Sequence, residues 1–296
     1  MSTIEKAMQA RGKAAAGGET PGSEAPLPPA TDASPPARGG AGQSRRVEID
    51  LPLLRRRGFL TPDAGRSRLA EELRQIKRAV LKNAFAEAPL RVPDANLVMV
   101  TSALAGEGKS FTAINLAISI AMELDRRVLL VDADVAKPSL HRYLGLAPQK
   151  GLIDYLTDPH AELYQFMLKT NIPKLSLLQA GSRHQYASEL LGSARMRTLV
   201  DELRDRYPDR VVIFDSPPVL LTNESRVLAG LAGQILMVVE ADRTLRERVK
   251  EALSAIEDDD KIVGLILNKN RRPSGGGYYG GYGYGYGHAS DTPSSD

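Results

Sequence analysis

Six apolar runs, interrupted by a polar residue only at Ser176, constrain the fold of this chain more than any other feature. Because side chains of a strand alternate between the two faces of a sheet, an unbroken apolar run predicts a strand buried on both faces. Segments with helical spacing of apolar residues lie between the runs, and this alternation predicts a doubly wound, mostly parallel α/β sheet with helices on both faces. The predicted strands are Leu97–Thr101, Val128–Val131, Leu175–Leu178, Val211–Phe214, Ile235–Val239 and Ile262–Leu267, and the predicted helices are Ser67–Ala86, Lys109–Leu124, Ser188–Tyr207, Asn223–Leu231 and Thr244–Ile256.

Composition divides the chain of 296 residues into four parts. Residues 1–50 are rich in Ala, Pro and Gly and lack the large apolar residues that offset ordering entropy, so we expect this leader to be disordered. Residues 51–90 hold a basic linker, which begins with Leu51–Gly58, and the first predicted helix. Residues 91–270 hold the α/β domain, and residues 271–296 form a tail of Tyr and Gly that we also expect to be disordered.

Composition also excludes several classes of function. The chain has no cysteine, which excludes disulfides, thiol catalysis and cysteine-ligated zinc. Its net charge of +3 and the lack of a basic stripe with interleaved aromatic residues argue against nucleic-acid binding. The polar first residues do not resemble a signal peptide, and no apolar run approaches the roughly 20 residues that span a bilayer. These features predict a cytoplasmic protein.

A glycine-containing loop joins the first long strand to the helix that follows it. Residues 103–110 fit the phosphate-binding pattern G-x-x-x-x-G-K-[ST], except that Ala103 replaces the first glycine. In such a loop backbone N–H groups surround phosphate oxygens, while Lys109 reaches the β- and γ-phosphates and Ser110 binds Mg²⁺. An ordinary strand-to-helix turn is the weaker alternative. We predict a P-loop NTPase-type domain that binds ATP through Ala105, Gly106, Glu107, Gly108, Lys109, Ser110 and Phe111.

Three aspartates follow two other predicted strands. Asp132 and Asp134 end the run that begins at Val128, and Asp215 ends the run that begins at Val211. Because the carboxyl ends of parallel strands meet at one edge of the sheet, all three should lie beside the phosphate loop. One such aspartate alone is equally well explained as a helix cap, but three beside the loop indicate a magnesium and phosphoryl-transfer site. Asp215 is the predicted Mg²⁺ ligand, and Asp132 or Asp134 would orient the proton of the attacking hydroxyl.

The tail carries half of the ten tyrosines of the chain, namely Tyr278, Tyr279, Tyr282, Tyr284 and Tyr286. The glycines between them leave no side chains for a core, so the phenol hydroxyls should be accessible. Taken alone, such a tract is more typical of a self-associating low-complexity segment than of a substrate. Beside a predicted phosphoryl-transfer site it becomes a candidate autophosphorylation segment.

Taken together, these motifs resemble those of the bacterial tyrosine autokinases of exopolysaccharide and capsule synthesis. The loop at residues 103–110, Leu129–Pro138 and Phe214–Pro218 are similar to the Walker A, A′ and B motifs of that family, and the tail is similar to its tyrosine cluster. The similarity extends from about Arg55 to the C-terminus. Gly58–Pro62 and Leu69–Arg74 resemble the subgroup found at exosortase (PEP-CTERM) loci.

The resemblance implies the activity and the roles of individual residues. It implies a non-specific protein-tyrosine kinase that uses ATP and Mg²⁺ to phosphorylate the tyrosines of its own tail, between subunits. It favours Asp132 as the base, with Lys109 and Asp134 as further catalytic residues. The implied metal site is formed by Ser110, Asp134 and Asp215.

The resemblance also implies an assembly. Glu71, Arg74 and Lys77 match the family's E-x-x-R-x-x-[RK] oligomerisation motif, which implies a ring-like homo-oligomer. From the residues alone, a solvated helix face with an ordinary Glu71–Arg74 pair is the alternative. The implied partners are a Wzz-like membrane chain-length determinant and a phosphotyrosine phosphatase, which would place the chain at the inner face of the cell membrane.

Some positions depart from the family pattern. Lys77 and Lys137 stand where Arg is commoner, and Tyr186–Ala187 stands where the family often has Asn-Pro. Two other classes stay open. One is a ParA/MinD-like partition or septum-positioning ATPase, although that class carries a lysine at the position of Leu104. The other is a nucleotide-switched scaffold of polysaccharide export that has no kinase activity.

Overall fold

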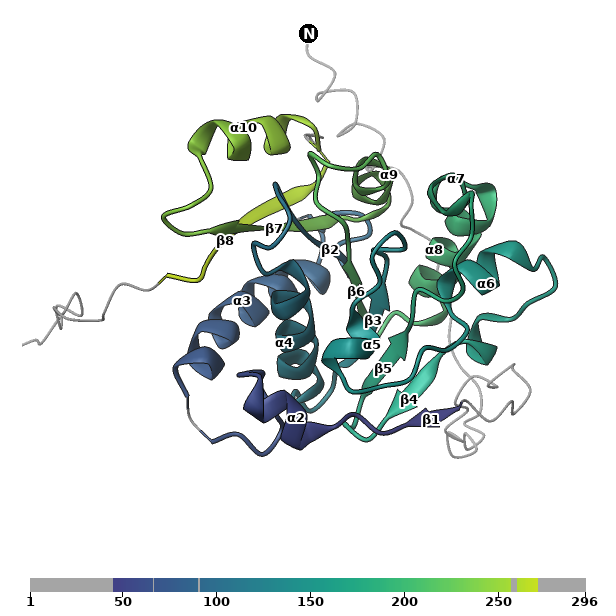
Figure 1. Ribbon diagram of the computed structural model, residues 1–296, viewed down its shortest axis with the longest axis horizontal. Coiled ribbons are helices and arrows are strands. Elements are labelled where there is room, and N and C mark those ends of the chain that lie inside the picture. The colour runs from purple at the N-terminus through teal and green to yellow at the C-terminus, as the bar shows by residue number, and fades with distance from the viewer. Residues whose placement is uncertain (1–44, 66, 90, 257–259, 271–296) are drawn as a thin grey trace, which may run out of the picture. The chain divides into compact units, whose positions relative to one another are not determined.

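One mixed sheet organises the residues described by the computed structural model, which are 45–65, 67–89, 91–256 and 260–270 (Figure 1). In these residues eight strands follow the order β1-β4-β5-β3-β6-β2-β7-β8, and every neighbouring pair is parallel except β4 and β5. The strands are β1 (Arg46–Val47), β2 (Leu97–Ser102), β3 (Arg127–Asp132), β4 (Leu168–Thr170), β5 (Leu175–Leu178), β6 (Arg210–Asp215), β7 (Gln234–Glu240) and β8 (Ile262–Asn268). The predicted doubly wound, mostly parallel α/β fold is confirmed. The leader up to residue 44 and the tail with its five tyrosines lie outside the described residues.

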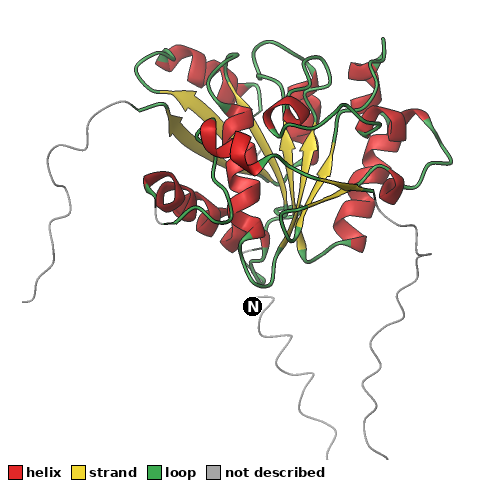
Figure 2. Cartoon of the chain, turned by 60° about the horizontal axis from the view of Figure 1, so that its bottom comes forward, coloured by secondary structure: helices red, strands yellow, loops and turns green. Residues whose placement is uncertain are grey.

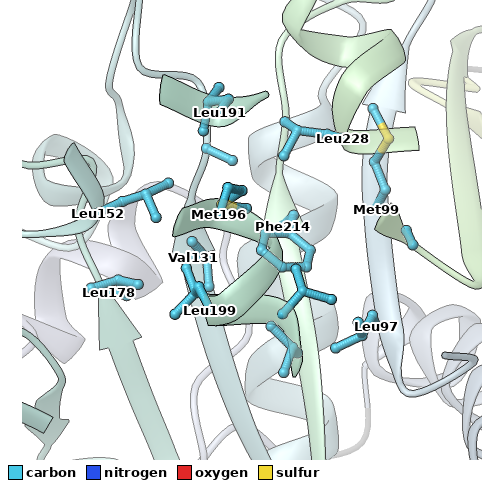
Figure 3. Packing of buried hydrophobic residues seen from close by; sticks show 14 of the residues in the cluster. Leu97, Met99, Val131, Leu152, Leu178, Leu191, Met196, Leu199, Phe214 and Leu228 are labelled. Atoms are coloured by element: carbon cyan, nitrogen blue, oxygen red, sulfur yellow. The ribbon is translucent and has the colours of Figure 1, made fainter. Parts of the chain in front are cut away.

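Helices cover both faces of this sheet (Figure 2). One apolar cluster joins α2, α3, α4 and α5 to one face, and a second joins α6 to α10 to the other. Phe214 of β6 lies at the centre of the second cluster, close to Met196 and Leu199 (Figure 3). The helices are α2 (Leu51–Arg56), α3 (Arg68–Ala84), α4 (Lys109–Ala121), α5 (Leu140–Tyr143), α6 (Leu152–Thr157), α7 (Ala187–Leu191), α8 (Ala194–Arg206), α9 (Glu224–Leu231) and α10 (Arg246–Ser254), with the 3₁₀ helix η2 (Leu163–Gln165).

The six predicted strands all form, but one of them is not buried on both faces. The central strands β2 and β6 are buried along their whole length. In β8 alternate residues are exposed, with Leu265 at 57% and Leu267 at 63%. The prediction of two buried faces is therefore wrong for β8, because this strand is the last of the sheet and pairs only with β7. None of the described helices is long and apolar enough to cross a membrane.

The helix predicted over Ser188–Tyr207 is interrupted. It forms two helices, because α7 ends at Gly192 and Ser193 begins α8. The Ser193 hydroxyl accepts a hydrogen bond from the backbone N–H of Met196 at 3.2 Å, which is the usual role of an N-cap serine. Gly192 is thus a signal that ends one helix, and Ser193 is a signal that starts the next.

The segment that precedes α3 packs against the sheet domain. Leu54 of α2 is fully buried, and the Asp50 side chain caps this helix by accepting from the N–H of Leu53 at 2.8 Å. Phe59 is also buried, and its ring centroid lies 4.8 Å from that of Phe111 at the start of α4. The basic linker expected from Leu51–Gly58 therefore contains helix α2, whose Leu54 side chain is buried in the apolar core.

Helix α3 presents the three motif charges to two different environments. Glu71 and Arg74 are half exposed and pair with each other at 2.9 Å. Lys77 faces α4 instead, where its ammonium lies 2.5 Å from a Glu123 carboxylate oxygen and 3.3 Å from the carbonyl oxygen of Ser119. Lys77 thus joins two helices of one chain, while Glu71 and Arg74 stay accessible to a second subunit.

This difference predicts different effects of two substitutions on stability. We expect Lys77→Ala to lower the free energy of unfolding by about 1 to 2 kcal/mol, because a charged hydrogen-bonding group is lost between α3 and α4. We expect Arg74→Ala to change it by less than about 0.5 kcal/mol. Urea denaturation at two protein concentrations measures both. Equal losses that increase on dilution would instead place both residues in a contact between subunits.

Candidate active site

The phosphate loop leaves the end of β2 and enters α4 with the backbone conformation that its glycines allow. Gly106 and Gly108 have φ of 87° and 102°, which side chains rarely adopt. At Gly108 a Cβ atom would also lie 2.0 Å from the side-chain amide of Asn268. Gly108 is the N-cap of α4, so the N-terminal N–H groups of this helix are open to an anion. Glycine is therefore required at position 108 for two reasons, the positive φ and the lack of space for a Cβ atom.

Lys109 lies among the predicted carboxylates. Its ammonium is 2.8 Å from Oδ2 of Asp134, and both side chains are largely buried. Burial disfavours the charged ammonium, but the carboxylates of Asp215 and Asp134 outweigh this effect and raise the pKa of Lys109. The lysine is therefore fixed in its charged form at the loop, where the phosphates of a nucleotide would lie.

The three predicted aspartates converge at the carboxyl edge of the sheet. Asp132 and Asp215 are directly opposite one another on β3 and β6, and all three are at least nine-tenths buried. Burial, followed by the charge of Asp215, raises the pKa of Asp132 to about 7. Burial also raises the pKa of Asp215 to about 6, although Lys109 and the Ser110 hydroxyl oppose it. The predicted grouping beside the loop is confirmed.

The hydrogen bonds of these carboxylates distinguish their roles. Oδ2 of Asp132 accepts from the backbone N–H groups of Ser139 and Leu140 at 3.1 and 3.0 Å, and so fixes the start of α5. Among the described residues, Oδ1 of Asp132 and both carboxylate oxygens of Asp215 have no partner in good hydrogen-bond geometry, although the Ser110 hydroxyl lies close enough to Asp215 to lower its pKa. Buried oxygens without partners are costly unless a cation or a proton compensates them.

The donor set suits Mg²⁺. Mg²⁺ is usually bound by one or two carboxylates, with nucleotide phosphates and water completing its shell. Asp215 offers unpaired oxygens and Ser110 a hydroxyl, which lies 3.3 Å from the hydroxyl of Ser139. Within the described part of the chain, no group of three or more acidic or histidine side chains could hold a metal ion by itself.

Ser139 is a residue of this site that the sequence analysis missed. Its hydroxyl contacts Ser110 and its N–H contacts Asp132, so it joins the predicted metal ligand to the end of β3. Serine is common in loops and has no distinctive pattern here. Only the return of the chain after β3 brings it to the phosphate loop.

The side chain of Glu107 braces the outer side of the loop, a role that the sequence did not reveal. This carboxylate is 2% exposed. Its Oε2 accepts from the N–H of Leu104 at 2.6 Å, and its Oε1 accepts from the hydroxyl of Thr244 and from the N–H of Glu240, the latter at 3.4 Å. The one available signal was a carboxylate in a loop that binds a polyanion.

Two residues at the end of β8 complete this brace. Asn268 donates to the carbonyl oxygen of Glu107 at 2.8 Å. Lys269 donates to the carbonyl oxygen of Gly106 at 2.6 Å and to the carboxylate of Glu240 at 3.1 Å. With these carbonyl oxygens held from outside, the N–H groups of the loop remain directed at the site.

A cavity of about 380 Å³ opens over this arrangement. Six of the seven predicted nucleotide-loop residues line it, namely Ala105, Gly106, Gly108, Lys109, Ser110 and Phe111. The seventh, Glu107, faces away as described. The far wall is apolar and is formed by Tyr143, Pro217, Pro218 and Leu221. The cavity thus combines phosphate donors, acidic side chains and an apolar wall.

The brace predicts that residues outside the cavity control nucleotide affinity. We expect Thr244→Val to weaken binding of Mg²⁺-ADP about fivefold, the value of one lost hydrogen bond. Glu107→Ala should weaken it by more than about tenfold, since the N–H of Leu104 also loses its partner. Calorimetric titration measures both affinities. Thr198→Val on α8 is the matched control, and an affinity unchanged in Glu107→Ala would contradict the role of the brace.

Comparisons with known proteins agree with this geometry. Residues 98–276 match the model of the CobQ/CobB/MinD/ParA nucleotide binding domain. The chain is 36% identical over 188 residues to tyrosine-protein kinase YwqD of Bacillus subtilis, which covers 62% of this chain and 77% of YwqD. It is 34% identical over 228 residues to the succinoglycan biosynthesis transport protein ExoP of Rhizobium meliloti, which covers 75% of this chain and 28% of ExoP.

A solved structure has a similar fold. The kinase domain of the Escherichia coli tyrosine kinase ETK superposes with a TM-score of 0.61 at 29% identity, covering 73% of this chain and 81% of that one. The chain spans about a quarter of the length of the longer relatives that it matches, ExoP among them. The chain belongs to the CobQ/CobB/MinD/ParA nucleotide-binding family and, within it, to the bacterial tyrosine-protein kinases.

Proposed function

We propose that this chain is an ATP-dependent protein-tyrosine kinase that phosphorylates the tyrosines of its own tail. The observation that carries the proposal is a cavity at a phosphate loop that Lys109 and Asp134 line, with the buried carboxylate of Asp215 close behind them. The same chain carries five tyrosines among the glycines of residues 275–287. Relatives named as tyrosine-protein kinases support the choice of reaction.

Each group has a distinct task in this proposal. Mg²⁺, held by Ser110, Asp134 and Asp215, would neutralise the charge that develops on the transferred phosphoryl group. Lys109 binds the β- and γ-phosphates. Oδ1 of Asp132 is the oxygen left to orient the tyrosine proton, because its Oδ2 is used by the start of α5.

The residues that precede the tail lie close to the phosphate loop. β8 ends at Asn268, and the side chains of Asn268 and Lys269 hold the phosphate loop. The residues that lead into the tail therefore lie at the edge of the active site. Covalent attachment gives the tail tyrosines a high effective concentration, on the order of millimolar, at any active site that they can reach.

We further propose that the kinase acts in exopolysaccharide or capsule synthesis, at the inner face of the cell membrane. The name of ExoP, a transport protein of succinoglycan biosynthesis, supports this setting. The proposed partners are a Wzz-like chain-length determinant, further copies of the chain in a ring that uses the exposed Glu71 and Arg74, and a phosphotyrosine phosphatase. Assignment to the exosortase-associated subgroup is part of the same proposal.

The first test is loss of the reaction when the loop lysine is removed. With ATP and Mg²⁺, we expect phosphotyrosine on residues 278–286 by mass spectrometry, and a loss of about 100-fold or more in Lys109→Met, because a donor to the transition state is gone. Lys82→Met, which changes an exposed lysine of α3, is the matched control. ATP hydrolysis without phosphotyrosine in the wild-type chain would instead indicate a nucleotide-switched ATPase.

A second experiment decides whether transfer occurs between subunits. A Lys109→Met chain is mixed with an active chain whose five tail tyrosines are changed to Phe. We expect phosphotyrosine on the Lys109→Met chain, at a rate that rises with protein concentration. A tail that is phosphorylated in the wild-type chain but never in this mixture would show that each active site uses its own tail.

A further inference from the structure

A second cavity, of about 560 Å³, adjoins the active site. Ala136 and Lys137, in the loop after β3, line both this cavity and the nucleotide cavity. The second cavity extends away from the phosphate loop toward α5 and toward the loop that follows β5. We call it the basic cleft, because its charged lining residues are Lys137, Arg142 and Arg183, with His141 beside them.

The charges of the basic cleft are all of one sign and are available. No carboxylate is among the lining residues, and in the described part of the chain neither Lys137 nor Arg183 forms an ion pair. The guanidinium of Arg142 contacts only the carbonyl oxygen of Pro138, at 3.4 Å. Burial and the Arg142 guanidinium together lower the pKa of His141.

The nearby carboxylate of Asp154 does not cancel these charges. Its Oδ2 accepts from the N–H groups of Gly151 and Ser182, both at 2.9 Å, and its Oδ1 accepts from the Ser182 hydroxyl at 2.7 Å. These bonds direct it into the loop rather than into the cleft. The cleft therefore suits a dianion that accepts several charge-assisted hydrogen bonds.

We propose that the basic cleft binds a phosphotyrosine of the tail and so holds the next tyrosine at the nucleotide cavity. This inference rests on the proposed autokinase function and adds to it an order in which the tail tyrosines are phosphorylated. A phosphotyrosine carries about −1.5 to −2 charges and three acceptor oxygens, which matches a site with two guanidinium groups and an ammonium. Phosphorylation would then become easier after the first transfer.

The spacing of the tyrosines agrees with two adjoining sites. Tyr282, Tyr284 and Tyr286 are each two residues apart. Two extended residues span about 7 Å, and the two cavities share the residues Ala136 and Lys137 as a common wall. A phosphotyrosine in the cleft and an unmodified tyrosine two residues away can therefore reach neighbouring sites at once.

Peptide binding tests the inference without any catalysis. The protein is the full chain with its five tail tyrosines changed to Phe, without ATP, and the probes are tail peptides of residues 280–288 with Tyr284 phosphorylated or not. Calorimetry should show the phosphopeptide binding at least about tenfold more tightly, since two or three charge-assisted hydrogen bonds are added. Arg183→Glu should remove this preference, while Arg197→Glu on α8, the matched control, should keep it.

Three results would overturn the inference. They are equal binding of the two peptides, a preference that survives Arg183→Glu, and competition by inorganic phosphate as strong as that by the phosphopeptide. Neither the probes nor the variants depend on kinase activity. A wild-type chain that forms no phosphotyrosine with ATP would refute the proposed function, whereas the peptide titration decides the cleft.

The distribution of products gives a second, kinetic readout. In an otherwise wild-type chain, Arg183→Glu should form singly phosphorylated tails at nearly the wild-type rate and multiply phosphorylated tails several-fold more slowly. Intact-mass spectrometry over time separates these species. A variant that slows the first and the later transfers equally would contradict an ordering role of the cleft.

Discussion

The attraction between one buried lysine and three buried aspartates determines how the functional part of this molecule is built. The single ammonium of Lys109 faces Asp132, Asp134 and Asp215 at the carboxyl edge of the sheet. Burial, and to a smaller extent the neighbouring carboxylates, raises the pKa values of Asp132 and Asp215, and the one positive charge of Lys109 does not compensate three buried carboxylates. In the proposed function, a divalent cation that binds with a nucleotide would supply the missing charge. The negative charges of the cluster therefore exceed its positive charge, and a bound cation would bring the two closer to balance.

The remainder of the fold keeps this cluster in place. The fully buried strands β2 and β6 fix the loop and Asp215 beside one another, and β3 adds Asp132 in register with Asp215. The ends of β7 and β8 hold the loop from its outer side through Glu107 and Lys269. Donors and acceptors are thus positioned before any ligand binds, which is how a site avoids reorganisation during reaction.

The sequence was sufficient to predict those parts of the molecule that depend on local pattern. Unbroken apolar runs located the six main strands, and the pattern around Gly106 and Gly108 located the phosphate loop, because both reflect constraints within a few residues. The approach of Asp132 and Asp215 followed from strand order in a parallel sheet. The exposed face of β8 did not follow, since an edge strand differs from a central one only in its neighbours.

What the sequence could not predict depends on contacts between distant segments. Ser139 and Thr244 are ordinary loop residues until the chain brings them to Ser110 and Glu107. Lys77 matched a motif for contacts between subunits, yet its ammonium pairs with Glu123 of the same chain. Helix α2, which contains Leu54, was not predicted because the arginines that follow Leu54 made the segment look like a basic linker. In each case the decisive partner lies far away in sequence.

The dependence of nucleotide affinity on Mg²⁺ tests the central role of the charge cluster most directly. ADP is titrated into the full chain with Mg²⁺ and with EDTA, and the same is done for Asp215→Asn, which keeps the shape of the side chain and removes its charge. The account predicts that Mg²⁺ strengthens ADP binding about tenfold or more in the wild-type chain and has little effect in Asp215→Asn. An equal effect of Mg²⁺ in both proteins would show that the buried carboxylates do not hold the metal.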